Sequence, residues 1–176
     1  DIKKLFVAKP GYSIVQCDLK TAEVYYAAVL SNDKFLQKAF IEKLDFHSYI
    51  AKQIFNLPCE ISEVKKLYPD ERQYSKAITF GIMYQAGPAT VAEEAHITFD
   101  EAKQFIKKYF NEARSLKTWI ETSSSFIERN AYIYSFFGRK RRLQESQSSS
   151  KGAAKHAIRS GVNFLIQSVA SDINVL

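Results

Sequence analysis

The pattern of hydrophobic and polar positions predicts an α+β chain that is mainly α-helical, with a small amount of β-structure. Residues 12–19, YSIVQCDL, are apolar and rich in β-branched side chains, which predicts a buried strand that ends at Asp18. Helices are expected over residues 21–30, about 32–43, 46–55, 61–68, 71–84, 88–95, 100–111, 113–130 and 152 to the last residue.

Polar and turn-forming residues set the expected boundaries of these elements. Asp45 and Asp70 are placed to cap the helices that follow them, and Pro69 ends the helix before it. The segment 132–143, YIYSFFGRKRRL, changes to a two-residue period with Gly138 at a turn, so we expect a hairpin there. Residues 144–150, QESQSSS, are expected to form a polar loop.

One predicted helix carries cations and aromatic rings at a regular spacing. Arg72, Lys76, Phe80 and Tyr84 follow one another every four residues, and four residues overshoot one helical turn by about 40°. Their side chains therefore form one slowly winding row, in the order that the phosphates and base of a nucleoside triphosphate would require. The alternative is a helix with two surface cations and two core rings. Gly81 costs this helix about 1 kcal/mol relative to Ala, which close approach of a flat ligand or of a neighbouring element would explain.

The composition allows one large domain or two small ones with an ample core. The chain has 176 residues, of which 46% are hydrophobic and 14% aromatic, and a net charge of +6. Cys17 and Cys59 match no metal-site spacing, so we expect reduced thiols in a cytosol-like, cytoplasmic compartment. The longest apolar run, VYYAAVL, is too short to span a bilayer, and no membrane partner is expected.

Positive charge is concentrated between Gly138 and Arg159. This segment holds seven cations and one acid, Glu145, so its charge equals the net charge of +6 of the whole chain. A surface that follows phosphates would concentrate charge in this way, and the alternative is an ordinary solvated basic face. The cations are Arg139, Lys140, Arg141, Arg142, Lys151, Lys155 and Arg159.

Further polar residues stand next to apolar runs. A carboxylate at the end of the predicted strand, Asp18, requires exposure, a partner or a bound cation, and the alternative is a helix cap. Glu23, five residues later, would by itself be a solvated carboxylate. Arg159, Asn163 and Gln167 form a second row at four-residue spacing, either for buried structural hydrogen bonds or for hydrogen bonds to a nucleic acid.

The order of these motifs resembles that of family A DNA polymerases, the bacterial DNA polymerase I type. CDLKTAE, residues 17–23, resembles the first signature of that family. RQYSKAITFGIMY, residues 72–84, resembles the second, Arg-x₃-Lys-x₃-Phe/Tyr-Gly-x₂-Tyr, and GRKRRL and RSGVNFLIQSVASDI resemble the stretch that follows it. The similarity covers essentially the whole chain, and departures such as Tyr25 and Thr79 indicate a divergent, phage- or plasmid-like member.

The resemblance implies template-directed DNA synthesis, in which a primer 3′-OH is extended with a dNTP by means of two Mg²⁺ ions. Asp18 and the backbone carbonyl of Leu19 would then be metal ligands. Arg72 and Lys76 would hold the triphosphate, and Lys76 could also protonate the departing pyrophosphate.

The resemblance also implies roles for the other candidate residues. His47 would contact the phosphates, and Phe80 would pack against the sugar and base and discriminate against dideoxynucleotides. Glu23, with Tyr84 packed beside it, would exclude a ribose 2′-OH. Primer–template contacts would come from Arg139, Arg141, Arg159, Asn163 and Gln167.

The implied architecture is a set of polymerase fingers helices with part of a palm. Residues 1–30 would be a palm segment with the first signature, residues 31–130 the fingers, and residues 131–176 a return to the palm with a basic hairpin and a DNA-contacting helix. The third signature of the family, which carries the second metal-binding Asp, is not reached, so we expect an incomplete catalytic fragment that does not polymerise alone. Its expected partners are primer–template DNA, dNTPs and the remainder of the polymerase chain or a complementing chain.

Two alternatives to a DNA polymerase stay open. One is a nucleotide- or DNA-binding module that has lost catalysis. The other is an RNA polymerase of the single-subunit phage type, against which Glu23 argues, because a side chain that excludes the 2′-OH is useless to an enzyme that uses ribonucleotides.

Overall fold

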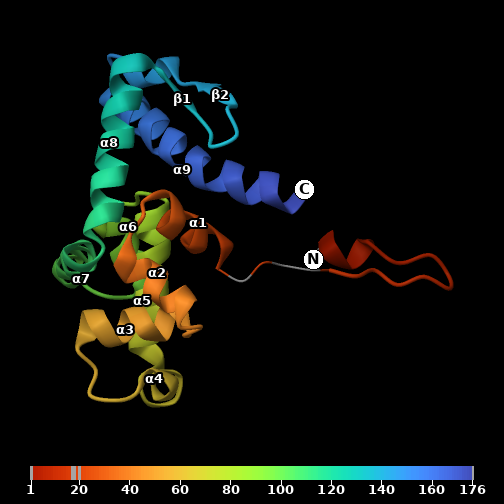
Figure 1. The fold of residues 1–176 in the computed structure, drawn as a ribbon, viewed down its shortest axis with the longest axis vertical. Helices are drawn as coiled ribbons and strands as arrows, with labels where there is room; N and C mark the ends of the chain where they lie inside the picture. The colour runs from red at the N-terminus through yellow and green to blue at the C-terminus, as the bar shows by residue number, and fades with distance from the viewer. Residues whose placement is uncertain (1, 17–18, 20, 176) are drawn as a thin grey trace.

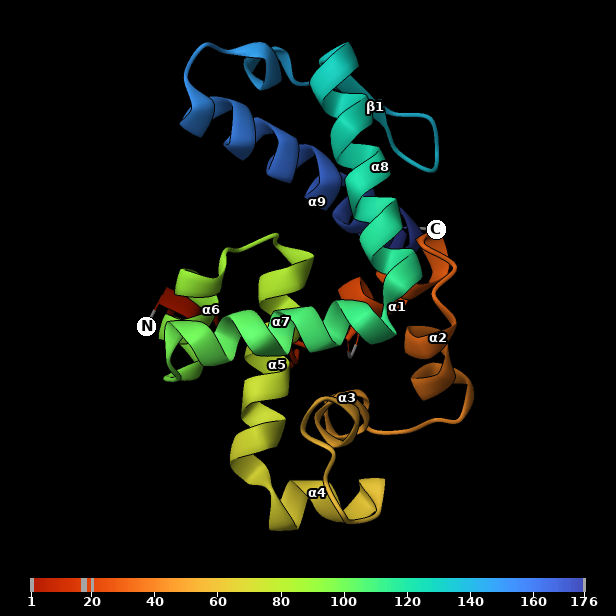
Figure 2. The ribbon, with the colours of Figure 1, turned by 90° about the vertical axis from the view of Figure 1, so that its left-hand side faces the viewer.

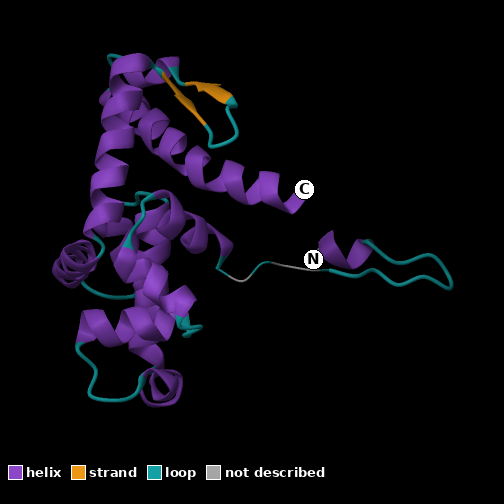
Figure 3. Ribbon diagram, in the orientation of Figure 1, coloured by secondary structure: helices purple, strands orange, loops and turns teal. Residues whose placement is uncertain are grey.

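The computed structural model describes residues 2–16, 19 and 21–175, which form a mainly helical fold with one two-stranded sheet (Figures 1 and 3). The predicted α+β class is therefore confirmed, and each helix expected after residue 20 begins and ends within two residues of its predicted position. The helices are α1 (Ala22–Leu30), α2 (Lys34–Ile41), α3 (Phe46–Phe55), α4 (Ile61–Leu67), α5 (Pro69–Met83), α6 (Pro88–Ala95), α7 (Phe99–Glu112), α8 (Arg114–Asn130), α9 (Lys151–Val175) and the 3₁₀ helices η1 (Ile2–Leu5) and η2 (Gln144–Gln147).

The predicted hairpin is confirmed. Strands β1 (Tyr132–Tyr134) and β2 (Lys140–Arg142) pair antiparallel, with Ile133 opposite Arg141. Gly138 has a φ of 82° in the connecting turn, a left-handed conformation that glycine adopts without the steric cost of a Cβ atom.

The predicted strand over residues 12–19 is wrong for the residues described there. Residues 12–16 and Leu19 belong to no helix or strand, and residues 2–16 extend to one side of the helices (Figure 1). Tyr12 and Val15 have exposed fractions of 73% and 82%. A strand needs a neighbour for its backbone hydrogen bonds, and β1 and β2 are the only paired strands in the described part of the chain. Cys17 and Asp18 lie outside the described residues.

Two local expectations are also corrected. Helix α5 begins at Pro69, so Tyr68 is its N-cap, while Asp70 lies in the first turn. Proline suits this first position because it lacks the N–H that would otherwise be left without a helical partner, and negative charge in the first turn is favourable. The expected polar loop after the hairpin contains η2, in which Ser146 is buried.

Helix α5 runs through the centre of the larger core cluster and packs against α3 (Figures 1 and 2). Ile50 and Ile54 of α3 and Ile78 and Ile82 of α5 belong to this cluster and are at most 4% exposed. The Ser75 hydroxyl of α5 donates a hydrogen bond of 2.8 Å to a backbone carbonyl of α3. Apolar burial and this polar contact together fix α5 beside α3.

The carboxylate of Asp33 connects α2 to α8 within the larger core cluster. One carboxylate oxygen caps α2 by accepting from the Leu36 N–H at 3.1 Å. The other accepts from the Leu116 N–H at the start of α8, at 3.0 Å. Asp33 is 2% exposed, and a buried carboxylate is tolerated when it accepts hydrogen bonds from groups that would otherwise be unsatisfied.

A smaller core cluster holds α9 against α8 and the hairpin, and Figure 2 shows α8 crossing α9. Its buried members are Ile127, Ile133, Leu143, Val162 and Leu165. In the part of the chain that the structure describes, none of the helices has the length and hydrophobicity that crossing a bilayer would require.

The glycine in the middle of α5 is explained by a neighbouring helix. Gly81 is buried, and a Cβ atom built on it would collide with the side chain of Val91 in α6. Of the two explanations considered from the sequence, close approach of another element is therefore the one that the packing supports.

We expect Gly81→Ala to destabilise the fold. The added methyl group must displace Val91, a β-branched side chain with little rotamer freedom, and overpacking of this kind costs about 1–3 kcal/mol. This exceeds the gain of about 1 kcal/mol from replacing a helical glycine. Urea unfolding followed by circular dichroism measures the change, with Gly152→Ala in the exposed first turn of α9 as the matched control. A Gly81→Ala chain as stable as the Gly152→Ala control would show that α6 does not press on α5.

Candidate functional site

An ion pair with Asp45 holds Arg72, the first residue of the row of cations and aromatic rings on α5. Arg72 Nε lies 2.9 Å from Asp45 Oδ2, and Arg72 Nη2 lies 3.1 Å from Asp45 Oδ1. Asp45 also caps α3, since the same Oδ2 accepts from the Ser48 N–H at 3.0 Å and from the Ser48 hydroxyl at 2.7 Å. The side chain of Arg72 is 24% exposed, and a guanidinium has five N–H donors, so donors remain for a ligand.

These contacts change the ionisation of Asp45. Burial alone would raise the pKa of the Asp45 carboxyl, but the hydrogen bonds from Arg72 and Ser48 and the positive charge of Arg72 outweigh burial, and the pKa lies well below its usual value. Asp45 is therefore a carboxylate at neutral pH, and it orients the guanidinium of Arg72.

The middle of the row lies where α5 crosses α3. Phe80 is half-buried, and its ring centroid is 6.0 Å from that of His47, which is 7% exposed. Lys76 is exposed, and its ammonium makes no hydrogen bond or ion pair with another described residue. The packing of α3 on α5 thus brings a predicted phosphate-contacting histidine next to the predicted sugar-contacting ring.

The last residue of the row connects α5 to α1 and α9. The Tyr84 hydroxyl donates to Glu23 Oε1 at 3.1 Å, and Gln167 of α9 lines the same cavity as Tyr84. Burial, followed by the negative charge of Glu23 and its hydrogen bond, raises the pKa of Tyr84, although the side chain of Gln167 acts in the opposite direction. Tyr84 is 44% exposed, so this end of the row is accessible.

The two rows predicted from the sequence meet at one cavity. Its volume is about 310 Å³, and it lies between the C-terminal end of α5, the hairpin and α9. Arg159, Asn163 and Gln167 face it from one side of α9. The lining residues are Tyr84, Arg141, His156, Arg159, Ser160, Asn163 and Gln167.

Asn163, which lines this cavity, has a buried acceptor. Its side-chain oxygen is buried and has no hydrogen-bond partner among the described residues. A buried amide oxygen without a partner is costly. A donor group on a ligand that enters the cavity would remove this cost.

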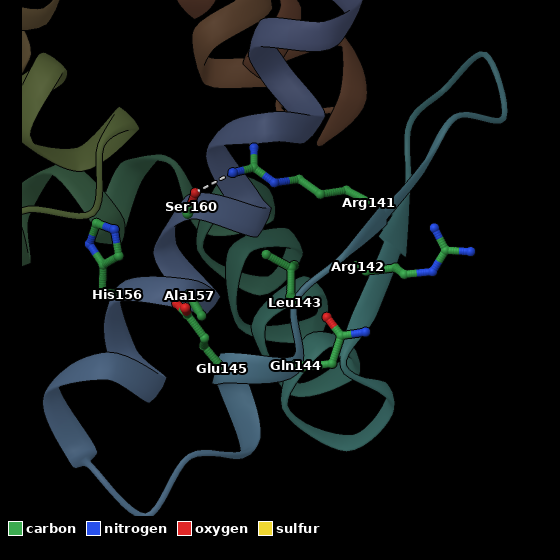
Figure 4. A pocket seen from close by; sticks show the side chains of 8 residues that line it. All are labelled: Arg141, Arg142, Leu143, Gln144, Glu145, His156, Ala157 and Ser160. Atoms are coloured by element: carbon green, nitrogen blue, oxygen red, sulfur yellow. Dashed lines mark hydrogen bonds between the residues drawn. The ribbon is translucent and has the colours of Figure 1, made fainter.

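A second depression of about 300 Å³ continues the cavity along α9 (Figure 4). In Figure 4, Arg141 reaches from β2 to α9, where its Nη2 donates to the Ser160 hydroxyl at 2.7 Å, whereas Arg142 points away. The Arg141 guanidinium also lies 5.3 Å from the ring centroid of Phe164. These contacts hold Arg141 over the groove that α9 and the hairpin form.

Arg139, a predicted DNA contact, has a partner within the chain. Its Nη2 lies 2.8 Å from Asp172 Oδ1, although the Arg139 side chain is 55% exposed. The structure thus keeps Arg139 near α9, but it places the residue outside the set that lines the two depressions.

Of the two predicted metal ligands, the structure describes only Leu19. Asp18 lies outside the described residues, and Leu19 is 50% exposed. Within residues 2–16, 19 and 21–175, no three His, Cys, Asp or Glu side chains gather in a way that could hold a metal ion.

Some residues of the site were not predicted from the sequence. Asp45 was expected only as a helix cap, and its partner Ser48 was not considered. His156 and Ser160 face the cavity beside Arg159. The signal available for them was helical spacing, since His156 lies three residues before Arg159 and Ser160 lies three residues before Asn163.

Comparison with known sequences gives one consistent result. The family model described as DNA polymerase family A matches residues 1–176. A DNA polymerase of Escherichia phage T5 is 45% identical across 97% of this chain. DNA polymerase I of Caldicellulosiruptor bescii and the thermostable DNA polymerase I of Thermus aquaticus are each 30% identical across 98% of this chain. The chain spans 23% of the phage protein and 20% of each bacterial protein.

A solved structure has the same fold. It is described as the POL domain of Pol1 from M. smegmatis in complex with DNA primer-template and dNTP. Its TM-score is 0.78 at 28% sequence identity, and the match covers 89% of this chain and 27% of the other.

We expect Asp45→Asn to destabilise the chain by about 1–3 kcal/mol at neutral pH, because Arg72 loses a charged partner and α3 loses a charged cap. The pKa of Asp45 is lower in the folded chain than the unfolded value of about 3.9. The stabilisation is therefore complete above about pH 4 and is lost as the pH falls through the folded-state pKa.

The measurement is the free energy of urea unfolding between pH 2 and pH 8 for both chains. The difference between them should be constant at neutral pH and should shrink below about pH 4. Glu42→Gln removes one partner of the exposed Lys38–Glu42 pair and should change stability by at most about 1 kcal/mol. A pH-independent difference would show that the charge of Asp45 does not stabilise the fold.

Proposed function

Because this chain belongs to DNA polymerase family A, we propose that it contributes the nucleotide-binding row and part of the primer–template surface to template-directed DNA synthesis. The observation that carries the proposal is the cavity where Tyr84, the last residue of the α5 row, meets Gln167, Asn163 and Arg159 of α9. An incoming nucleotide and the end of a primer must be adjacent for nucleotidyl transfer, and here the two candidate surfaces are adjacent.

In this proposal, the α5 row binds the dNTP. Lys76 supplies an exposed charge to the triphosphate and protonates the departing pyrophosphate. Arg72, oriented by Asp45, presents its remaining donors to the same phosphates, and His47 supports them. Phe80 packs against the sugar and base.

Glu23 and Tyr84 limit the sugar that enters. Their hydrogen bond of 3.1 Å holds the Glu23 carboxylate beside the ring of Tyr84. We infer that this pair occupies the space that a 2′-OH would need, which favours deoxynucleotides over ribonucleotides.

The basic groove along α9 would follow the primer–template. Arg141 and Arg159 provide positive charge, and Asn163 and Gln167 provide hydrogen bonds within reach of sugars and base edges. Arg139 would contribute charge from the edge of this groove while remaining paired with Asp172. Shape and charge would dominate over sequence in such a contact.

Mg²⁺ is proposed from the family resemblance. Asp18 and the Leu19 carbonyl are oxygen ligands of the kind that Mg²⁺ prefers, and bound ions would offset the charge that develops on the phosphates. The chain spans 23% of the phage relative and 20% of the bacterial relatives. We propose that further carboxylates come from other parts of a polymerase, and that these 176 residues do not extend a primer by themselves.

We propose that residues 1–30 and 131–176 of this chain belong to the palm of a polymerase and residues 31–130 to its fingers. The second candidate function is a binding module that keeps the row and the groove without catalysis. The accessible Lys76 and the groove along α9 would serve either function.

Lys76→Ala distinguishes the two functions in a complete polymerase that contains these residues. Loss of a general acid lowers turnover by about 10²–10⁴-fold, so single-turnover primer extension at saturating dNTP should slow by that factor. A pure binding module would lose only salt-dependent affinity. The matched control is Lys103→Ala on the exposed surface of α7, which should leave the rate unchanged, and equal rates for the two variants would refute the catalytic role of Lys76.

Arg159→Ala tests the primer–template surface on the 176-residue chain. Each phosphate contact contributes about 0.9 to the slope of log affinity against log salt concentration, so the slope should decrease by about that amount. Fluorescence anisotropy with a labelled primer–template at several KCl concentrations gives the slope. Arg114→Ala, at the exposed start of α8, is the control for general charge, and an equal change in both variants would contradict the α9 assignment.

A further inference from the structure

A cavity of about 450 Å³ lies on the side of α5 that faces away from the Arg72–Tyr84 row. Tyr74, which lines it, is two residues from both Arg72 and Lys76, and two residues turn a helix by about 200°. The other walls come from the end of α3, the loop between α6 and α7, and the first half of α7. Its volume is within the range of about 300–1,000 Å³ of small-molecule sites.

Three aromatic rings form the apolar part of this cavity. The ring centroids of Phe55 and Phe105 are 4.6 Å apart at an interplanar angle of 72°, and those of Phe55 and Tyr74 are 6.3 Å apart at 60°. All three side chains are half-buried. Inclined rings around one space present both edges and faces to it, and the faces carry the negative potential that attracts cations.

Two carboxylates, Glu71 and Glu101, line the cavity together with His96, Ile97 and Thr98. Glu71 makes no hydrogen bond or ion pair with another described residue. Glu101 uses Oε2 to accept from the backbone and hydroxyl of Thr98, and these bonds lower its pKa, so it is charged at neutral pH. In a chain with a net charge of +6, this cavity combines aromatic faces with local negative charge.

The structure contains one ammonium group beside these rings. Lys108 Nζ lies 6.0 Å from the ring centroid of Phe105 and donates to the backbone carbonyl of Ile54 at 3.3 Å. Lys108 does not line the cavity itself. The Phe105 ring therefore already attracts one ammonium group, and the open cavity beside it leaves room for a second cation.

We propose that this cavity binds a small organic cation with a guanidinium or alkylammonium head group. The rings would contact the cation through their faces, and Glu71 and Glu101 would offset its charge. An anion would be repelled by both carboxylates, and a neutral apolar ligand would cover Glu71 without giving it a partner. This site is separate from the row and groove of the proposed polymerase function and does not depend on them.

The test is a titration of the 176-residue chain with methylguanidinium chloride at pH 8 and constant ionic strength, followed by NMR of ¹³C-labelled Phe and Tyr rings. Saturable shifts are expected at Phe55, Tyr74 and Phe105, with rings outside the cavity unchanged. The absence of saturable shifts at these three rings would overturn the proposal.

Variants distinguish a specific site from general attraction to acids. Glu71→Gln and Tyr74→Leu should each weaken binding by about three- to tenfold, with the fold checked by circular dichroism. Glu128→Gln removes the same charge from an exposed position on α8 and should leave the affinity unchanged. If Glu128→Gln weakens binding as much as Glu71→Gln does, no specific site exists.

A second titration with N-acetylarginine amide identifies the source of the cation. Affinity equal to that of methylguanidinium would support the arginine side chain of a peptide as the ligand. Exclusion of the blocked arginine while methylguanidinium binds would support a free small cation. Both results confirm the class of ligand, and failure of both cations to bind contradicts it.

Discussion

The carboxylate of Asp45 connects local structure, tertiary packing and the candidate site. It accepts a hydrogen bond from the Ser48 N–H in the first turn of α3. It also accepts two hydrogen bonds from the guanidinium of Arg72, which lies in α5, 27 residues later. Because both helices depend on one half-buried charge, α3 cannot rotate against α5 without separating that charge from its donors. His47, two residues after Asp45, is therefore held opposite Phe80. The geometry of the row follows from this single anchor.

The other end of the row depends on close helix packing. Gly81 lets α6 approach α5, and the smaller core cluster holds α9 against α8 and the hairpin. These apolar contacts carry no chemistry of their own, but they decide where Tyr84 and Gln167 meet. Residues separated by 83 positions in the chain thus line one cavity. A site made of helix ends requires rigid packing behind it, since side chains on loosely packed helices would not keep this geometry.

The parts that the sequence predicted are those determined locally. Helix α3 begins where Asp45 predicted, because a cap and its N–H donor lie three residues apart. The four-residue spacing from Arg72 to Tyr84 predicted a row, because helical periodicity is also a property of one local segment. The strand over residues 12–19 was predicted wrongly for the residues described there, because an apolar run rich in β-branched residues describes a strand's side chains but not the neighbour that its backbone needs. The Arg72–Asp45 pair and the cavity along α9 join separate elements, so no periodicity within one element could reveal them.

Helix α5 presents opposite chemistry on its two sides. One side carries Arg72 and Lys76 toward space where phosphates would bind, and the other carries Glu71 and Tyr74 into the aromatic cavity. Glu71 and Arg72 are consecutive residues, so the charges on the two sides lie within a screening length of about 10 Å and act on each other directly. Sites of opposite sign do not compete for the same ligand, and bound ligands of opposite charge would attract each other. Any coupling beyond this attraction would pass through the position of α5 itself, which the Asp45 anchor and the Val91 contact with Gly81 restrict.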